Sequence, residues 1–203
     1  MSWERCSWAG SEPNVGRDPA DRLAYGLSLT LNPLTAESLV ALWFWAHGDV
    51  LGSVLVLLTT GAILAIVASY IRTREVDVFL ERIEDRLPPI AVGCVCNGLG
   101  ALAARLLGSP LASKILTAYA LAGLIVYLIT RHWKISLHAA SMGAVAGLLC
   151  WAGDWAPLLA WLPVTGAVCW ARLRMNAHTT GQVTLGALGG AAFLYGFLAL
   201  LAR

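Results

Sequence analysis

Charged residues are scarce in this chain of 203 residues: they make up 13% of it, whereas 58% of the residues are hydrophobic. The mean hydropathy is +0.70. Soluble domains carry roughly 25% charged residues. The low charge excludes an ordinary soluble domain, a disordered chain and a nucleic-acid binder, so no nucleic acid is expected as a partner. What remains is an all-α, polytopic transmembrane helical bundle in a lipid bilayer. At about 20 residues per span, the length allows about six to seven spans.

The sequence also lacks clustered metal ligands, internal repeats and a signal peptide. Its five cysteines lie singly or in apolar runs, and Cys94 and Cys96 have no His or Cys cluster nearby. We therefore expect no metal site and no cofactor. The first residues are polar, with no apolar core after a basic start. This pattern predicts a polar N-terminal arm over residues 1–26, amphipathic or loosely ordered, and a single transmembrane domain over residues 27–203.

Seven apolar stretches are candidate spans. The first, 27–47, is interrupted by Asn32, Pro33 and Glu37. We expect it to form a short span, and a re-entrant segment is the alternative. The remaining stretches are 50–71, 88–107, 111–130, 135–151, 156–171 and 182–201. The range beginning at 88 starts with two prolines, which are tolerated in the first turn of a helix.

Three polar junctions separate these spans, at 72–86, 131–134 and 172–181. Two spans lie between each junction and the next, so all three must lie on the same face of the membrane. They hold eight cations: Arg72, Arg74, Arg82, Arg86, Arg131, Lys134, Arg172 and Arg174. The positive-inside rule assigns this face to the cytoplasm, although the same cations also suit an anionic ligand. Phosphate is the natural ligand, because guanidinium groups bind its oxygens in bidentate fashion.

The second junction runs directly into a span. Ser136 is well placed as an N-cap, and His138 follows in the first helical turn. A phosphate at this helix N-terminus would meet free backbone N–H groups and the positive end of the helix dipole. The alternative is that Ser136 only caps the helix and that His138 is an interfacial histidine.

The third junction contains Arg172, His178 and Gln182. His178 and Gln182 are four residues apart and therefore share one helical face. The Gln182 side-chain oxygen could accept a hydrogen bond from one ring nitrogen of His178, which would aim the other nitrogen outward as a nucleophile. The alternative is a snorkelling arginine beside a capping histidine.

These spacings resemble the three motifs of the type 2 phosphatidic acid phosphatase superfamily. Its third motif is S-R-x5-H-x3-D, and this chain has Ala171 and Arg172, then His178, then Gln182. Its second is P-S-G-H, and here Ser136 and His138 keep the serine and the histidine. Its first is K-x6-R-P, and Arg86 stands two residues before Pro88, as in the D-R-x-P variant of short bacterial and archaeal members. The resemblance covers roughly residues 81–190.

The resemblance implies an integral membrane phosphatase, in the plasma membrane of a prokaryote, that hydrolyses a lipid or isoprenoid phosphate or diphosphate without a metal. It also implies that a phosphohistidine forms during the reaction. His178 is then the nucleophile, and His138 is the general acid that protonates the leaving oxygen. Arg86, Arg172 and Ser136 form the phosphate cradle.

Three positions depart from the family pattern. The lysine of the first motif is replaced by Phe79, and Lys134 or Arg82 is expected to take its role. The glycine of the second motif is Leu137. The aspartate of the third is Gln182, an amide that can orient His178 but cannot supply a negative charge.

Two other functions therefore stay open: a catalytically weak or silent lipid-phosphate binding or transport protein that uses the same cradle, and a structural membrane protein with snorkelling cations. The oligomeric state cannot be predicted from the sequence.

Overall fold

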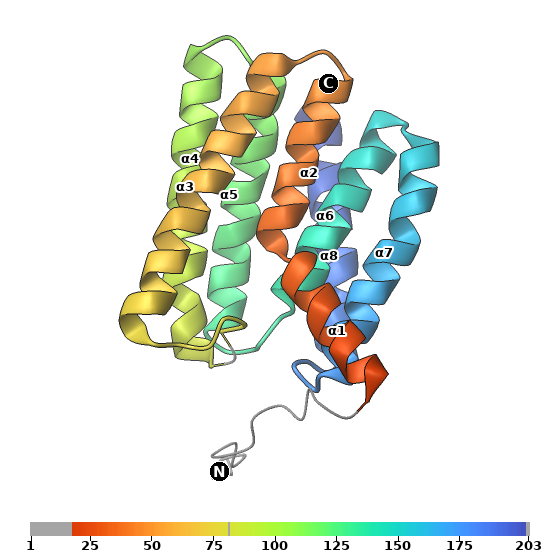
Figure 1. Ribbon diagram of the computed structural model, residues 1–203. Coiled ribbons are helices and arrows are strands. Elements are labelled where there is room, and N and C mark those ends of the chain that lie inside the picture. Colours follow the sequence, from red (N-terminus) through yellow and green to blue (C-terminus); the bar gives the residue numbers. More distant parts are fainter. Residues whose placement is uncertain (1–17, 81, 202–203) are drawn as a thin grey trace.

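The structure is a computed structural model that describes residues 18–80 and 82–201. These residues form eight α-helices and no strand (Figure 1). The helices are α1 (Pro19–Thr30), α2 (Pro33–Ala46), α3 (Val50–Arg74), α4 (Ile83–Leu106), α5 (Pro110–Thr130), α6 (Leu137–Ala152), α7 (Trp155–Arg174) and α8 (Thr180–Leu201). Five of them, α3, α4, α5, α7 and α8, are long and apolar enough to cross a membrane. The protein is thus an all-α, polytopic transmembrane helical bundle, as the composition predicts.

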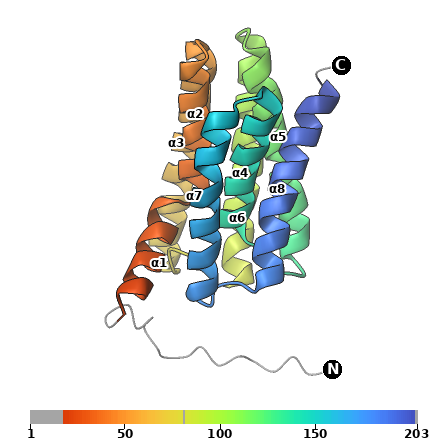
Figure 2. The same cartoon turned by 90° about the vertical axis from the view of Figure 1, so that its right-hand side faces the viewer.

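The prediction of one span over 27–47 is wrong, because the chain breaks at Asn32. The Asn32 side-chain oxygen accepts hydrogen bonds from the backbone N–H groups of Leu34 and Thr35, at 2.9 and 3.1 Å. Together with Pro33 in the first turn, this cap starts a new helix, α2. The preceding helix, α1, lies at an angle to the bundle at one end (Figure 2). It crosses the expected arm boundary at residue 26, and the rest of the arm, residues 1–17, lies outside the described residues.

Two members of the bundle are shorter than a span. Helix α2 has 14 residues and α6 has 16, which correspond to lengths of about 21 and 24 Å. The hydrocarbon core of a bilayer is about 30 Å thick. The described residues therefore include five helices of spanning length, and the shorter apolar helix α6 also runs through the bundle between the second polar junction and the opposite end.

Helix α4 begins at Ile83, five residues before the expected start at Pro88. Pro88 and Pro89 consequently lie inside the helix rather than in its first turn. The earlier start carries Arg86 into the second turn of α4, on a rigid element.

The helices form two groups. Helices α3, α4 and α5 pack together on one side, α6, α7 and α8 with α1 form the other, and α2 lies between them, packed against α3 and α6 (Figure 1). Within the second group, α6 and α8 approach most closely, because small residues line their contact. A Cβ atom on Gly143 of α6 would overlap the backbone carbonyl of Ala187, and one on Gly190 of α8 would overlap that of Ala140.

The three polar junctions lie together at the same end of the bundle, at the bottom of Figures 1 and 2. This confirms the prediction made by counting spans. At the other end, loops are tied by side chains: Trp43 Nε1 donates to Asp154 Oδ2 at 2.5 Å, and Ser109 Oγ donates to Asp49 Oδ2 at 3.0 Å.

Candidate functional site

Two buried arginines lie at the end of the bundle that carries the polar junctions. Arg86 on α4 is 2% exposed, and Arg172 in the last turn of α7 is 0% exposed. Arg86 Nη1 donates a hydrogen bond to the Ile135 carbonyl at 3.1 Å, and Nη2 lies 3.4 Å from His178 Nε2. One guanidinium thus joins α4, the junction before α6 and the junction before α8. Positions that lie far apart in the sequence, on α4 and in two of the polar junctions, therefore meet at one guanidinium.

The ring of His178 is held by its Nδ1 atom. This nitrogen lies 3.1 Å from the Lys134 carbonyl oxygen and 3.2 Å from Gln182 Oε1. Both partners are acceptors, so Nδ1 carries the proton and donates to them. Nε2 therefore carries the lone pair, and this lone pair faces the guanidinium of Arg86. The hydrogen bond expected between His178 and Gln182 is confirmed, and Lys134 adds a second acceptor that the sequence did not reveal.

Gln182 also fixes the start of α8. Its Oε1 accepts a hydrogen bond from the backbone N–H of Thr179 at 3.0 Å, and Thr179 Oγ1 accepts from the Gln182 N–H at 3.4 Å. The backbone carbonyl of Gln182 accepts from the Ser136 N–H at 3.3 Å. One residue thus couples the nucleophile candidate to the N-terminus of α6.

The surroundings of His178 favour its neutral form. Burial lowers the pKa of His178 from 6.5 to about 3, and the positive charges of Arg86, Arg172 and Lys134 act in the same direction. The hydrogen bond to Gln182 opposes them without reversing the shift. A neutral imidazole, with no proton on the attacking nitrogen, is the form that can attack phosphorus.

The second histidine, His138, lies in the first turn of α6 and is 8% exposed. Its Nε2 donates to the Ser28 carbonyl of α1 at 3.0 Å. Its Nδ1 is buried and has no hydrogen-bond partner among the described residues. Ser136 caps α6 as predicted, because its Oγ accepts from the Ala139 N–H at 3.4 Å. The role of α1 in covering His138 was not predicted, since nothing in the sequence links residues 28 and 138.

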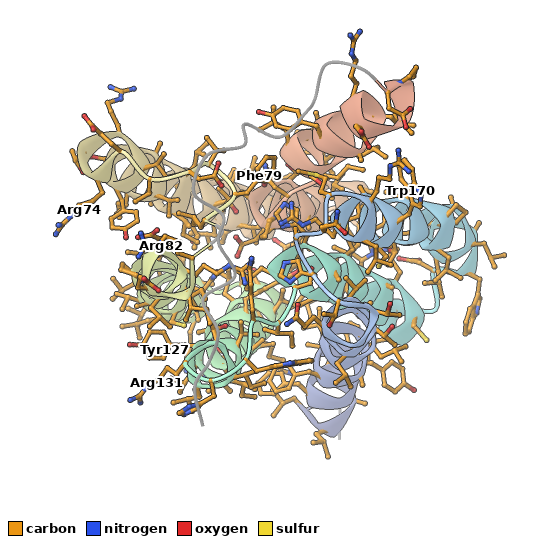
Figure 3. The ribbon with its side chains drawn as sticks, turned by 90° about the horizontal axis from the view of Figure 1, so that it is seen from below. Arg74, Phe79, Arg82, Tyr127, Arg131 and Trp170 are labelled. Atoms are coloured by element: carbon orange, nitrogen blue, oxygen red, sulfur yellow. The ribbon has the colours of Figure 1, made fainter. Side chains whose placement is uncertain are left out.

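Phe79 supports the buried Arg172. The Arg172 guanidinium carbon lies 5.2 Å from the centre of the Phe79 ring, within range of a cation–π interaction. Tyr25 of α1 packs edge-on against the Phe79 ring, with the two ring centres 5.4 Å apart. Phe79 lies inward in the view along the bundle, whereas Arg74 and Arg131 point away from the bundle (Figure 3). The Phe79 ring thus contributes to positioning the buried guanidinium of Arg172.

The other two predicted cradle cations differ in their positions. Arg82 does not join the cluster: its side chain is 74% exposed and pairs with Glu84 at 2.8 Å. Lys134 is half-buried, its carbonyl holds His178, and its charge contributes to the lowered pKa of that ring. The structure therefore brings together Arg86, Lys134, Ser136, His138, Arg172, His178 and Gln182.

Two cavities are lined by residues of this cluster. The smaller, of about 560 Å³, lies at the α7–α8 junction and is lined by His178, Gln182 and their neighbours. The larger, of about 1080 Å³, lies between the two groups of helices and has Arg86 and His138 in its wall.

No group of three or more His, Cys, Asp or Glu side chains in the described segments is arranged to hold a metal ion. Comparison with family models, with curated proteins and with solved structures finds no match to this chain. The resemblance to the phosphatase superfamily stays a prediction that depends on the motif residues and their spacing.

Proposed function

We propose that this protein is an integral membrane phosphatase that hydrolyses a lipid or isoprenoid phosphate or diphosphate through a phosphohistidine. The observation that carries the proposal is the orientation of His178. Its Nδ1–H is held by two acceptors, and its Nε2 lone pair faces Arg86 Nη2 at 3.4 Å. A nucleophile aimed at a buried cation suits a substrate whose reacting centre is surrounded by negatively charged oxygens.

In the first step, the phosphate group lies between Arg86, Arg172 and the N-terminus of α6. His178 Nε2 attacks phosphorus, the P–N bond forms, and the bond from phosphorus to the lipid oxygen breaks. The leaving oxygen takes a proton from His138, for which the unoccupied Nδ1 is the available position. Negative charge on the entering phosphate favours protonation of His138, because it offsets the positive charge of the two arginines.

In the second step, water attacks the phosphohistidine. His138 takes a proton from this water, the P–N bond breaks, and inorganic phosphate leaves with His178 restored. The smaller cavity gives water a route to His178 from the end of the bundle. The larger cavity gives an amphiphilic substrate a route from within the bundle, so the two reactants approach from different sides.

The site faces the cytoplasm in this proposal. Arg74 and Arg131 lie at the same end of the bundle as the site, are exposed, and line neither of the two cavities. Their positions agree with the positive-inside rule independently of the buried cations. The membrane is proposed to be the plasma membrane of a prokaryote, on the strength of the motif resemblance alone.

A second function, a lipid-phosphate binder or transporter with little or no turnover, is favoured by one observation. Both acceptors at His178 Nδ1, the Gln182 amide and the Lys134 carbonyl, are neutral. Neither supplies the negative charge that stabilises an imidazolium as attack proceeds, and the corresponding loss is severe in the serine protease triad.

Release of inorganic phosphate by the purified protein in detergent tests the proposal. Substrates are prenyl phosphates and diphosphates, phosphatidic acid and phosphatidylglycerophosphate. We expect turnover in the wild type and in His132→Ala, an exposed histidine of the same junction, and none in His178→Ala. Equal rates in wild type and His178→Ala would refute the mechanism. Binding without turnover in the wild type would favour the second function.

A further inference from the structure

The larger cavity extends from the site into the depth of the bundle. Its walls are mostly aliphatic and come from both helix groups: Ile63, Val67, Ile90, Ile129, Leu185 and Leu194 are examples. Arg86 and His138 lie at its outer end. An apolar chamber that opens onto a cationic site is complementary to an amphiphilic anion, whose tail would lie in the chamber and whose charged group would lie at the cations.

The inner end of this chamber is polar. On α4 the lining residue farthest from the site is Asn97, and on α2 it is Glu37, while Tyr119 lies at the same depth on α5. Glu37 is 5% exposed and Asn97 is 6% exposed. The Glu37 side chain hydrogen-bonds with Asn97 and Thr60. Glu37 Oε1, Asn97 Oδ1 and the Tyr119 hydroxyl are left without a hydrogen-bond partner among the described residues. Buried polar atoms in a membrane bundle mark a functional position by default.

We propose that the chamber binds the hydrocarbon tail of an amphiphilic phosphate and that the Glu37–Asn97–Tyr119 cluster sets the tail length it accepts. The proposal rests on the proposed function for the position of the phosphate at Arg86. It goes further by naming the substrate class: phosphates with a tail of medium length rather than long polyisoprenoids.

The cluster limits tail length because its polar atoms need water or another partner. A tail that ends short of the cluster leaves room for water beside Glu37 and Asn97. A longer tail displaces that water and cannot replace its hydrogen bonds, so affinity falls by roughly tenfold for each group left unpaired.

The helix geometry gives the permitted length. Asn97 lies eleven residues after Arg86 on α4, which is about 16 Å at 1.5 Å per residue. An extended chain advances by about 1.2 Å per bond, so this distance corresponds to about 13 bonds. Dodecyl and tetradecyl tails fit, whereas a hexadecyl tail reaches the cluster.

Two glycines of α4 offer a matched pair of variants. Gly93 lines the chamber about 10 Å above Arg86, and Gly98 is exposed on the same helix and does not line it. A Cβ atom at either position would meet nothing within 4 Å. Gly93→Leu therefore shortens the chamber, and Gly98→Leu adds the same side chain outside it.

The experiment measures the affinity of alkyl phosphonates, from hexyl to octadecyl, for the protein in lipid nanodiscs. Phosphonates resist hydrolysis, so binding is measured without turnover. Each phosphonate partitions into the bilayer to the same extent whichever variant is present. This partition therefore cancels when the affinity of a variant is divided by that of the wild type for the same phosphonate. We expect the wild-type affinity to peak at dodecyl or tetradecyl and to fall at least tenfold at octadecyl. Gly93→Leu moves the peak to about octyl, and Gly98→Leu leaves it unchanged.

The polar cluster is tested by Glu37→Leu and Asn97→Leu, which should restore octadecyl binding by about tenfold each. If either variant fails to fold, Gly93→Leu and Gly98→Leu still test whether the chamber sets the preferred tail length. Affinity that rises with chain length equally in all variants would overturn the proposal. Absence of phosphate release from every alkyl phosphate would refute the proposed function instead, and the phosphonate profile would still report on the chamber.

Discussion

Replacing Gln182 by glutamate introduces a negative charge without changing the shape of the side chain. Gln182 Oε1 lies 3.2 Å from His178 Nδ1 and accepts the Thr179 N–H at 3.0 Å. A carboxylate at this position would keep both contacts. The backbone donor and the N-terminus of α8 favour its ionised form. The perturbation therefore adds the charge partner that the site lacks.

The expected gain follows from this distance. A full charge 3.2 Å from an imidazolium contributes about 1.3 kcal/mol in water-like surroundings and about 5 kcal/mol at an effective dielectric constant of about 20. Each 1.36 kcal/mol is tenfold in rate, so kcat is expected to rise by roughly tenfold to several-thousandfold. Gln182→Asp, whose carboxylate is one methylene shorter, should give a smaller gain.

The assay is the pH dependence of phosphate release by wild type, Gln182→Glu and Gln182→Ala. The carboxylate raises the pKa of His178 from about 3 towards its ordinary value. The gain should therefore appear near neutral pH and diminish in acid, where protonation removes the nucleophile. A folded Gln182→Glu protein with a rate within about twofold of wild type at neutral pH would refute the charge-partner reasoning.

Three further predictions concern the general acid, the helix contact and the titration of the nucleophile. His138→Ala should lower kcat most for poor leaving groups such as alkyl phosphates and least for nitrophenyl phosphate; equal losses for both would argue against a general acid. Gly190→Ala should lower the thermal midpoint by several degrees and impair phosphate release, because its methyl group meets the Ala140 carbonyl, whereas Gly189→Ala meets nothing within 4 Å and should behave as wild type. The ring nitrogen resonances of His178 should not titrate between about pH 8 and pH 5. The pKa of His178 is about 3 in the folded protein, below its value of 6.5 in the unfolded chain. The free energy of unfolding that neutral His178 contributes is therefore fully present above about pH 6.5 and is lost as the pH falls towards 3. A titration midpoint of His178 near pH 6.5 would contradict its burial among cations.

The positions of most site residues could be predicted from the sequence. Counting spans placed the three polar junctions on one face, and the four-residue spacing predicted the contact of His178 with Gln182, which the structure has at 3.2 Å. These inferences succeed because they depend on periodicity and membrane thickness, which are local and general. The N-cap role of Ser136 is of the same kind.

Other parts of the site depend on tertiary contacts that no local pattern reveals. The Lys134 carbonyl at His178 and the Ser28 carbonyl at His138 are backbone groups, and any residue type could supply them. The break at Asn32 was visible as a polar interruption, but only the observed cap shows that it separates two helices. Arg82 was one of two cations expected to take the role of the lysine replaced by Phe79, yet it pairs with its neighbour Glu84 at the surface.

The central claim is that His178 carries the phosphoryl group during the reaction. The most direct measurement is rapid mixing of the purified protein with a prenyl phosphate radiolabelled in its phosphate, followed by alkaline denaturation, which preserves phosphohistidine, and mapping of the labelled peptide. The account predicts label on His178 in the wild type, more label in His138→Ala if water attack is slowed more than transfer, and none in His178→Ala. Phosphate release from the wild type with no label on His178, or with the same label in His178→Ala, would contradict it.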